Sequence, residues 1–281
     1  MKPVSEQSIL ITGATDGIGR ITAERLAQMG ARVLLHGRDP EKCRAARDEI
    51  RRETGSDKLE FYVADFSSLP EVRRMAAEVL AAHDRLDVLI NNAGVLPFPG
   101  GKKDRPRSDQ GHELCMAVNY LAPFLLTILL LPLLRASGAA RIVNVSSAAQ
   151  EAIDFEDFML ADGYSPMRAY ARSKLALAMF TIELHQRLKS DGITVNCLHP
   201  GSLLDTKMVR QAFGTPQGTA ESGAEVEVYV AVSPDVDGVS GAYFDRMTQA
   251  EAHAQAYDAE IRQRLWALSL ELTDAGAGTD H

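Results

Sequence analysis

Two polar side chains lie four positions apart in an otherwise apolar helical stretch, AYARSKLALAMF at 169–180. Positions i and i+4 share one face of a helix, so Tyr170 and Lys174 are expected to lie close together. A phenol has an ordinary pKa near 10, and a positive charge about 4–6 Å away typically lowers it by about 1–3 units. Tyr170 could then exchange a proton near neutral pH. Because this spacing also arises by chance, the pair alone is weak support.

A glycine-rich segment, TGATDGIG at 12–19, follows the first predicted strand. Gly13, Gly17 and Gly19 permit a tight turn and a close approach of the backbone to a ligand, and the N-terminus of the next helix attracts phosphate. Ordinary strand-to-helix turns also use glycine. Because this segment is the first turn and precedes a good helix, it predicts a dinucleotide pyrophosphate site.

The end of the second predicted strand, HGRD at 36–39, bears on the choice of cofactor. An NAD site places an acidic residue there for the ribose 2′-OH. Here Gly37 takes that position and Arg38 follows, so a 2′-phosphate is not repelled and Arg38 can pair with it. The pattern predicts NADP(H), with Arg20 adding a second positive charge. The alternative, which Asp39 keeps open, is that Arg38 is a solvated loop residue.

The remaining pattern alternates apolar strands with helices, which is typical of a parallel sheet buried on both faces. We predict an α/β fold: a single-domain, Rossmann-type doubly wound sheet of about seven strands with helices on both faces. The domain spans 1–281, with a core at about 8–245 and a C-terminal helix at about 249–273, in which Tyr257, Ile261 and Leu265 share an apolar face. The strands are expected at 8–14, 32–38, 59–66, 86–94, 140–147, 193–201 and 241–245.

Composition narrows the classes of partner. The net charge is −8, which argues against nucleic acid or an anionic membrane as a partner. Three widely spaced cysteines match neither a disulfide framework nor a metal cluster, so we expect no metal and a cytoplasmic protein. The apolar run 114–134 is long enough to span a bilayer. Asn119, Pro123 and Pro132 interrupt it, and we expect a core or interface helix instead.

The order of the motifs resembles that of the short-chain dehydrogenase/reductase family over residues 8 to about 245. The matching pieces are TGATDGIG at 12–19, AD at 64–65, NNAG at 91–94, Asn119, VNVSS at 143–147, YARSK at 170–174 and HPG at 199–201. Further segments, GRD at 37–39 and RLWALSLELT at 264–273 among them, are similar to the retinol-dehydrogenase-like branch. The resemblance implies an NADP(H)-dependent oxidoreductase that acts on a carbonyl or an alcohol.

The resemblance also assigns cofactor contacts. Asp65 would bond the adenine amino group and Phe66 would line the adenine slot, while Pro200 and Gly201 would lie against the nicotinamide, with Thr206 near its carboxamide. The implied cofactor-binding set is Gly13, Thr15, Asp16, Gly17, Ile18, Gly19, Arg38, Asp65, Phe66, Asn92, Ala93, Gly94, Tyr170, Lys174, Pro200 and Gly201.

Four residues take catalytic roles by the same resemblance. Tyr170 would be the acid and base, and Lys174 would lower its pKa and bind the nicotinamide ribose. Ser147, rather than Ser146, would hold the substrate oxygen. Asn119 would bend its helix and hold a relay water near Lys174; it could equally be a buried polar residue at a helix irregularity, and the two roles are compatible.

The substrate side departs from the common pattern, because Tyr170 lies 23 positions after Ser147. We expect the insert 148–169 to form part of the substrate wall, and the segments 95–110 and 203–225 to close the pocket. Cationic residues in the first of these segments could attract an acidic substrate, although a solvated loop is the favoured interpretation. They are Lys102, Lys103, Arg105 and Arg107.

We therefore expect a small-molecule carbonyl or alcohol substrate that is medium-sized and apolar or aromatic. The alternatives are a non-catalytic nucleotide-sensing or interaction protein on the same fold, and a cofactor-retaining epimerase or dehydratase. The resemblance implies a homodimer or homotetramer that associates through the apolar helices near 112–135 and 167–190.

Overall fold

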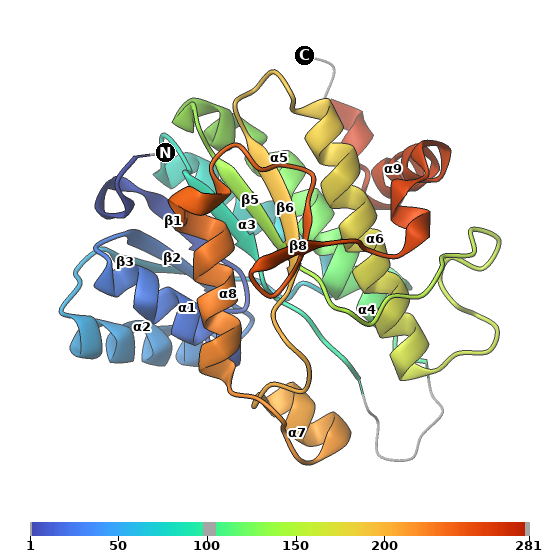
Figure 1. The fold of residues 1–281 in the computed structure, drawn as a ribbon, viewed down its shortest axis with the longest axis horizontal. Helices are drawn as coiled ribbons and strands as arrows, with labels where there is room; N and C mark the ends of the chain where they lie inside the picture. The colour runs from blue at the N-terminus through green and yellow to red at the C-terminus, as the bar shows by residue number, and fades with distance from the viewer. Residues whose placement is uncertain (1, 98–104, 279–281) are drawn as a thin grey trace.

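The computed structural model describes residues 2–97 and 105–278, and its centre is one eight-stranded sheet in the order β3-β2-β1-β4-β5-β6-β7-β8 (Figure 1). All neighbouring strands are parallel except β7 and β8. The predicted doubly wound parallel sheet is confirmed. The strands are β1 (Ser8–Ile11), β2 (Arg32–Gly37), β3 (Leu59–Val63), β4 (Val88–Asn91), β5 (Arg141–Val145), β6 (Thr194–His199), β7 (Tyr243–Asp245) and β8 (Thr248–Ala250).

The eighth strand differs from the prediction of about seven. β8 pairs antiparallel with β7 through a tight turn in which Arg246 has a φ of 56°. All three residues of β8 are exposed. A strand without a buried face has no alternating apolar pattern, so periodicity could not indicate it.

Helices cover both faces of the sheet, because successive strand residues point to opposite sides. In β1, Ile9 and Ile11 pack into the core beneath α1 and α8, whereas Leu10 packs into the core that contains residues of α3, α5 and α6. The helices are α1 (Gly17–Gln28), α2 (Pro40–Thr54), α3 (Leu69–Ala82), α4 (Leu114–Met116), α5 (Ala122–Ser137), α6 (Pro166–Arg187), α7 (Lys207–Phe213), α8 (Ala220–Val232) and α9 (Ala259–Thr273).

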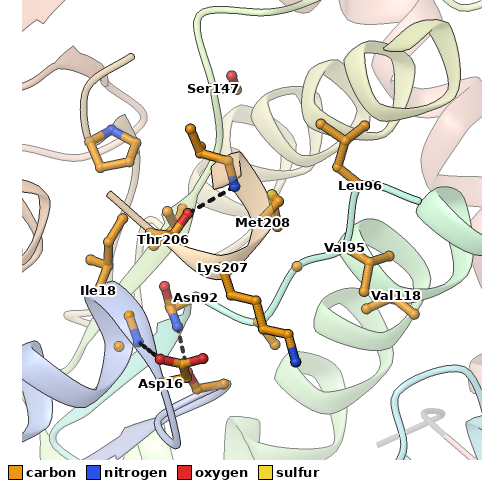
Figure 2. Close-up of a pocket in the computed structure, with 18 of the residues that line it drawn as sticks. Asp16, Ile18, Asn92, Val95, Leu96, Val118, Ser147, Thr206, Lys207 and Met208 are labelled. Atoms are coloured by element: carbon orange, nitrogen blue, oxygen red, sulfur yellow. Dashed lines mark hydrogen bonds between the residues drawn. The ribbon is translucent and has the colours of Figure 1, made fainter. Parts of the chain in front are cut away.

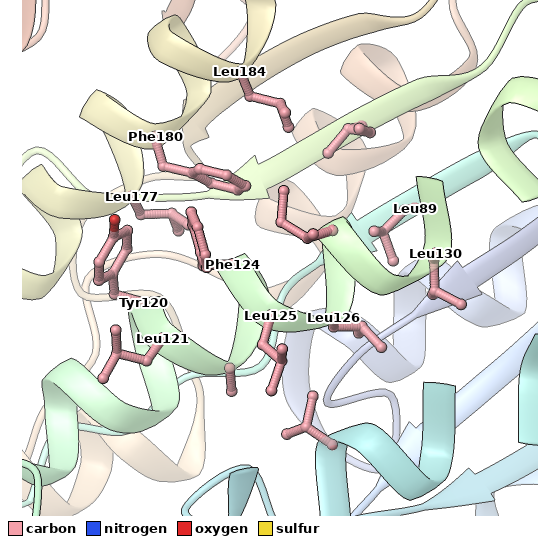
Figure 3. Packing of buried hydrophobic residues seen from close by; sticks show 14 of the residues in the cluster. Leu89, Tyr120, Leu121, Phe124, Leu125, Leu126, Leu130, Leu177, Phe180 and Leu184 are labelled. Atoms are coloured by element: carbon pink, nitrogen blue, oxygen red, sulfur yellow. The ribbon is translucent and has the colours of Figure 1, made fainter. Parts of the chain in front are cut away.

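The apolar run near 114–134 forms a continuous helical segment, Leu114–Ser137, in which a π-helical turn, Ala117–Leu121, joins α4 to α5. The segment is long and apolar enough to cross a membrane, and 83% of its most apolar window is buried inside the protein. Figure 3 shows its residues, Phe124 among them, packed against Phe180 of α6. The helix irregularity predicted at Asn119 is present as the π-helical turn.

The predicted C-terminal helix, about 249–273, begins later than expected. Residues 254–257 form a short 3-10 helix, and Asp258 caps α9 by accepting hydrogen bonds from the amides of Glu260 and Ile261. Tyr257 is therefore outside the helix and 47% exposed, with its hydroxyl accepting the Ala252 amide. The helical spacing of apolar residues includes Tyr257 by coincidence, because the Asp258 carboxylate caps the helix only after that residue.

α9 covers the outer side of α5 and α6. The Trp266 ring lies 5.2 Å from the Phe124 ring and 6.1 Å from the Phe180 ring. The Tyr120 hydroxyl shares a 2.5 Å hydrogen bond with Ser269. These helices were expected to contact a second subunit, and part of that surface is instead covered by the chain itself. The oligomeric state stays a prediction.

Candidate active site

A cleft of about 940 Å³ opens at the carboxyl ends of the parallel strands, where ligands bind in open α/β sheets. Every residue of the predicted cofactor-binding set lines it, and so does Ser147. Figure 2 shows part of this set: Asp16, Ile18 and Asn92 lie at one side of the cleft, and Ser147 lies apart from them. Of the predicted catalytic residues, Asn119 alone does not line the cleft.

The β1–α1 turn is held against the segment after β4. The side-chain amide of Asn92 donates to the carbonyls of Thr12 at 2.8 Å and Gly13 at 3.1 Å. A Cβ at Gly13 would lie 2.8 Å from the Ala93 Cα atom, closer than real contacts allow, and the φ of Gly13 is +68°. The glycine is needed for this approach, which leaves the turn open at the N-terminus of α1.

His36, which the sequence analysis did not select, joins three strand ends. Its Nδ1 accepts the Gly13 amide at 3.2 Å, and its Nε2 lies 3.0 Å from the Ala64 carbonyl. Its ring stacks on Phe66, with 4.1 Å between centroids. Burial lowers the pKa of His36 to about 4, so the imidazole is neutral at pH 7 and can serve as both acceptor and donor. The sequence signal that could have identified His36 is a histidine next to the end of the apolar strand β2.

The residues after β2 favour a 2′-phosphate by shape as well as by charge. A Cβ at Gly37 would lie 2.5 Å from the Thr15 Cγ2 atom, so the acidic side chain of an NAD site has no room there. Arg38 lines the cleft, and so does Lys42, which the sequence analysis missed. Neither side chain pairs with a carboxylate in the part of the chain that the structure describes. Two cations thus face the cleft.

The prediction that Arg20 adds a positive charge to this site is wrong. Its guanidinium pairs with Glu24 at 3.2 Å, Glu49 at 3.3 Å and Glu53 at 2.9 Å, and it does not line the cleft. Position next to the last glycine suggested the role, but α1 supplies the Glu24 carboxylate and the facing side of α2 supplies those of Glu49 and Glu53. Lys42, in the first turn of α2 and four residues after Arg38, is the better second cation.

Tyr170 and Lys174 share a face of α6, as predicted, and the Lys174 Nζ atom lies 5.6 Å from the Tyr170 ring centroid. Burial lowers the pKa of Lys174 to about 8, and its ammonium donates to the Val145 carbonyl at 2.7 Å. Burial also raises the pKa of Tyr170, which a hydrogen bond with Ser147 opposes. The predicted lowering of this pKa by Lys174 is not seen, because desolvation of the phenol is the larger effect.

The two adjacent serines differ in what their hydroxyls do. The Ser146 hydroxyl donates to the backbone carbonyl of Lys174 at 2.8 Å, which ties β5 to α6. The Ser147 hydroxyl opposes the rise in the pKa of Tyr170, and it accepts the Ala149 amide at 3.1 Å. Ser147 is therefore the serine that shares a polar surface with Tyr170.

Asn119 lies one layer behind the cleft and is fully buried. Its Oδ1 accepts the Val95 amide at 2.7 Å, and its Nδ2 donates to the Val95 carbonyl and the Ser173 hydroxyl, both at 3.0 Å. A Cβ at Gly94 would lie 3.4 Å from Asn119 Oδ1 and 3.5 Å from Lys174 Nζ, so Gly94 keeps open the space between them. The relay water stays a prediction.

At the other end of the cleft, Pro200 and Gly201 follow β6 and lead into α7. Thr206 lines the cleft, and its hydroxyl caps α7 by accepting the Val209 amide at 3.3 Å (Figure 2). A carboxamide contact would therefore be a second use of this hydroxyl.

All three segments predicted to surround the substrate contribute residues to the cleft, in unequal measure. Of the insert 148–169, Ala148, Ala149 and Met167 line the cleft, whereas its two phenylalanines, 155 and 158, stack on each other elsewhere. Side chains of the segment 203–225 supply more of the wall, as Figure 2 shows for Met208 opposite Leu96. The apolar wall residues are Val95, Leu96, Leu114, Val118, Met167, Leu203, Leu204, Met208, Val209 and Phe213.

The basic loop residues do not face the cleft where the structure describes them. The Arg105 guanidinium donates to the Met159 carbonyl and so fastens the insert, and Arg107 forms a β-bridge with Glu113. Lys102 and Lys103 lie outside the described residues.

Comparisons with known proteins agree with this arrangement. A family model described as short chain dehydrogenase matches residues 7–217. Human retinol dehydrogenase 13 is 38% identical over 95% of this chain and 84% of its own. Mouse polyprenol dehydrogenase is 40% identical over 99% of this chain and 87% of its own. A short-chain dehydrogenase structure from Escherichia coli, complexed with NADPH, aligns with a TM-score of 0.71 at 32% identity, covering 86% of this chain and 96% of that one. The chain belongs to the short-chain dehydrogenase family.

Proposed function

We propose that the protein reduces a ketone, or oxidises the corresponding alcohol, with Tyr170 as acid and base. Ser147 would hold the substrate oxygen, Lys174 would bind the ribose and favour the phenolate, and Asn119 would position a relay water. The observation that carries the proposal is that the Ser147, Tyr170 and Lys174 side chains line the same cleft, with the Lys174 Nζ atom 5.6 Å from the Tyr170 ring centroid.

The enzyme is an NADP(H)-dependent oxidoreductase that acts on CH–OH donors. The residues fit this cofactor: the glycine positions leave room for pyrophosphate, Gly37 excludes the acid of an NAD site, and Arg38 and Lys42 offer charge to a 2′-phosphate. Asp65, Phe66, Asn92, Ala93 and Gly94 would hold the adenosine portion, and Pro200 and Gly201 the nicotinamide. The bound cofactor supplies or accepts the hydride.

A reduction requires one proton, and these residues can supply it. A reduced carbonyl oxygen is an alkoxide, and the Tyr170 phenol, which is protonated at neutral pH, can give it a proton. The Ser147 hydroxyl can donate to the same oxygen and stabilise its developing charge. Once Tyr170 has lost its proton, the Lys174 ammonium stabilises the phenolate. The same residues would accept the proton in the reverse reaction, and we propose the ketoreductase direction.

The substrate is inferred from the wall and from the relatives. Ten apolar side chains from 95–118, 167 and 203–213 line the cleft, so burial of an apolar molecule there is favourable. The relatives are named for retinol and polyprenol, two apolar alcohols. We therefore propose a medium-sized apolar or aromatic carbonyl compound or alcohol.

The test is turnover of a carbonyl and alcohol panel by wild type and Tyr170→Phe. We expect the kcat of Tyr170→Phe to fall at least about 1,000-fold, because the variant has no hydroxyl to transfer the proton or to contact the substrate oxygen. NADPH affinity should stay within about twofold. Tyr229→Phe, on α8 away from the cleft, is the matched control. Turnover retained by Tyr170→Phe would refute the assignment, and a wild type inert to the whole panel would favour the sensor alternative.

The same proposal includes a single domain, 1–281, and a cytoplasmic homodimer or homotetramer. The continuity of one sheet from β3 to β8 supports the single domain. Sedimentation of the purified chain tests the assembly.

A further inference from the structure

We propose that the C-terminal segment 252–264 positions the substrate side of the active site from outside the cleft, because Gln150 and Gln255 tie it to Ser147 and to the insert 148–169. The two glutamines are positioning residues and do not touch the reacting atoms. This inference rests on the proposed role of Ser147.

Gln150 connects the C-terminal segment to the backbone of Ser147. Its Nε2 donates to the Ser147 carbonyl at 2.9 Å, and its Oε1 accepts the His253 amide at 2.8 Å. The Tyr243 hydroxyl donates to the same Ser147 carbonyl at 3.2 Å. Both polar atoms of the Gln150 amide are therefore used, which sets its orientation and makes it a bridge between residues far apart in the sequence.

Gln255 connects the same segment to the insert. Its Oε1 accepts the Ile153 amide at 2.7 Å, and its Nε2 donates to the Ile153 carbonyl at 3.0 Å. One side chain thus satisfies both backbone groups of Ile153, as a neighbouring strand would. The Ile153 side chain is 4% exposed and belongs to the larger core, so this point of the insert is fixed from two directions.

A third contact is weaker. The Arg264 guanidinium pairs with Glu156 at 2.9 Å and lies 4.6 Å from the Phe155 ring centroid. The Glu156 side chain is 85% exposed, and exposed ion pairs contribute little. The two glutamine bridges are consequently the main contacts through which the C-terminal segment positions the insert.

The consequence for the site is geometric. The Ser147 hydroxyl accepts the Ala149 amide, so its direction depends on the backbone at 147–149, the stretch that Gln150 and Tyr243 hold. Ala148 and Ala149 also line the cleft. Loss of either bridge should loosen the substrate side and leave the cofactor side unchanged, because neither glutamine lines the cleft.

The first test needs no turnover, so it is independent of the proposed function. Hydrogen exchange of the Ile153 amide is measured in wild type, Gln255→Ala and Gln263→Ala. Gln263, exposed on α9, is the matched control. We expect exchange about tenfold faster in Gln255→Ala alone, since its acceptor is gone. An unchanged rate in Gln255→Ala, or the same increase in Gln263→Ala, overturns the proposal.

The second test separates a positioning role from a structural one, and it also serves if Gln255→Ala does not fold. Gln150→Ala should lower kcat about fivefold on a substrate found in the panel, while NADPH affinity stays within about twofold. In Gln255→Ala the KM of the carbonyl substrate should rise about threefold. The proposal would be overturned if Gln150→Ala kept the wild-type kcat and KM, or if its NADPH affinity fell by the same factor as its kcat.

Discussion

The two ends of the cleft are built in different ways. At the cofactor end, the ends of neighbouring strands lie side by side, so the Asn92 side chain reaches the β1–α1 turn from the next strand, and Gly13 and Gly37 have no room for a side chain. At the substrate end, the backbone is held by side chains from distant segments, such as Gln255 on Ile153 and Arg105 on Met159. The cofactor end depends on glycine positions that have no side chain, and the substrate end depends on side chains that reach it from distant segments.

This difference has a physical origin. The cofactor end lies where parallel strands finish side by side, so the sheet itself sets the spacing of the turns. The substrate end lies in the insert and in α7, which have no strand to fix them. The cofactor end should therefore tolerate few substitutions, whereas substitutions at the substrate end should weaken substrate binding gradually. Substitutions at the two ends test this difference.

Among the substitutions that compare the two ends, the largest effect is expected at Arg38. Arg38→Ala should weaken NADPH binding about 30-fold and leave NADH binding nearly unchanged, since only NADPH has the 2′-phosphate and a charged hydrogen bond is worth about 2 kcal/mol. Lys42→Ala should weaken NADPH binding about tenfold. Fluorescence titration of both nucleotides measures the ratio.

Arg20→Ala is the control for this prediction, because Arg20 is already paired with three carboxylates. It should leave the ratio of NADPH to NADH affinity within about twofold of wild type. Equal or tighter binding of NADH by the wild-type protein would contradict the roles given to Gly37 and Arg38.

An intermediate effect is expected from Glu227, which lies fully buried on α8 behind the cofactor end. Its Oε2 accepts the Thr22 hydroxyl at 2.8 Å, and burial raises the pKa of Glu227 to about 8, although Thr22 and Lys174 oppose the shift. The folded protein thus retains a proton that the unfolded chain loses near pH 4.5. The stability contributed by Glu227 is present below pH 4.5 and is lost as the pH rises to 8.

Glu227→Gln should remove this pH dependence, because an amide oxygen can still accept from Thr22. Between pH 6 and 7 the unfolding free energy of wild type should fall by about 1.4 kcal/mol relative to the variant, which is about tenfold in the unfolding equilibrium constant. Urea denaturation at both pH values measures the difference. If the difference in unfolding free energy between the two proteins were the same at pH 6 and pH 7, Glu227 would not keep its proton on folding.

The contrast also explains what could be predicted from the sequence. The cofactor end could be predicted because its determinants are local: TGATDGIG, the glycine at 37 and NNAG each act within a few residues of a strand end. The pairing of Tyr170 with Lys174 followed from helix geometry alone. Their pKa values did not, since the raised pKa of Tyr170 comes from burial, which depends on the packed protein.

What was missed depends on contacts between distant segments. Gln255 and Ile153 are separated by 102 residues, and nothing near either one marks the pairing. Arg20 was assigned to phosphate because the carboxylates of α2 that pair with it could not be anticipated. β8, exposed throughout, had no apolar pattern.

The smallest effect is expected at the substrate end. Met208 of α7 is half-buried and lies in the wall of the cleft, opposite Leu96 in Figure 2. Met208→Ala should raise the KM of an apolar substrate about threefold, because part of a thioether side chain no longer covers it, and Met208→Leu should restore it. NADPH affinity should not change. Met247→Ala, exposed at the β7–β8 turn, is the control. If Met208→Ala cost as much as Arg38→Ala, the substrate end would be as rigidly specified as the cofactor end, and the contrast between them would fail.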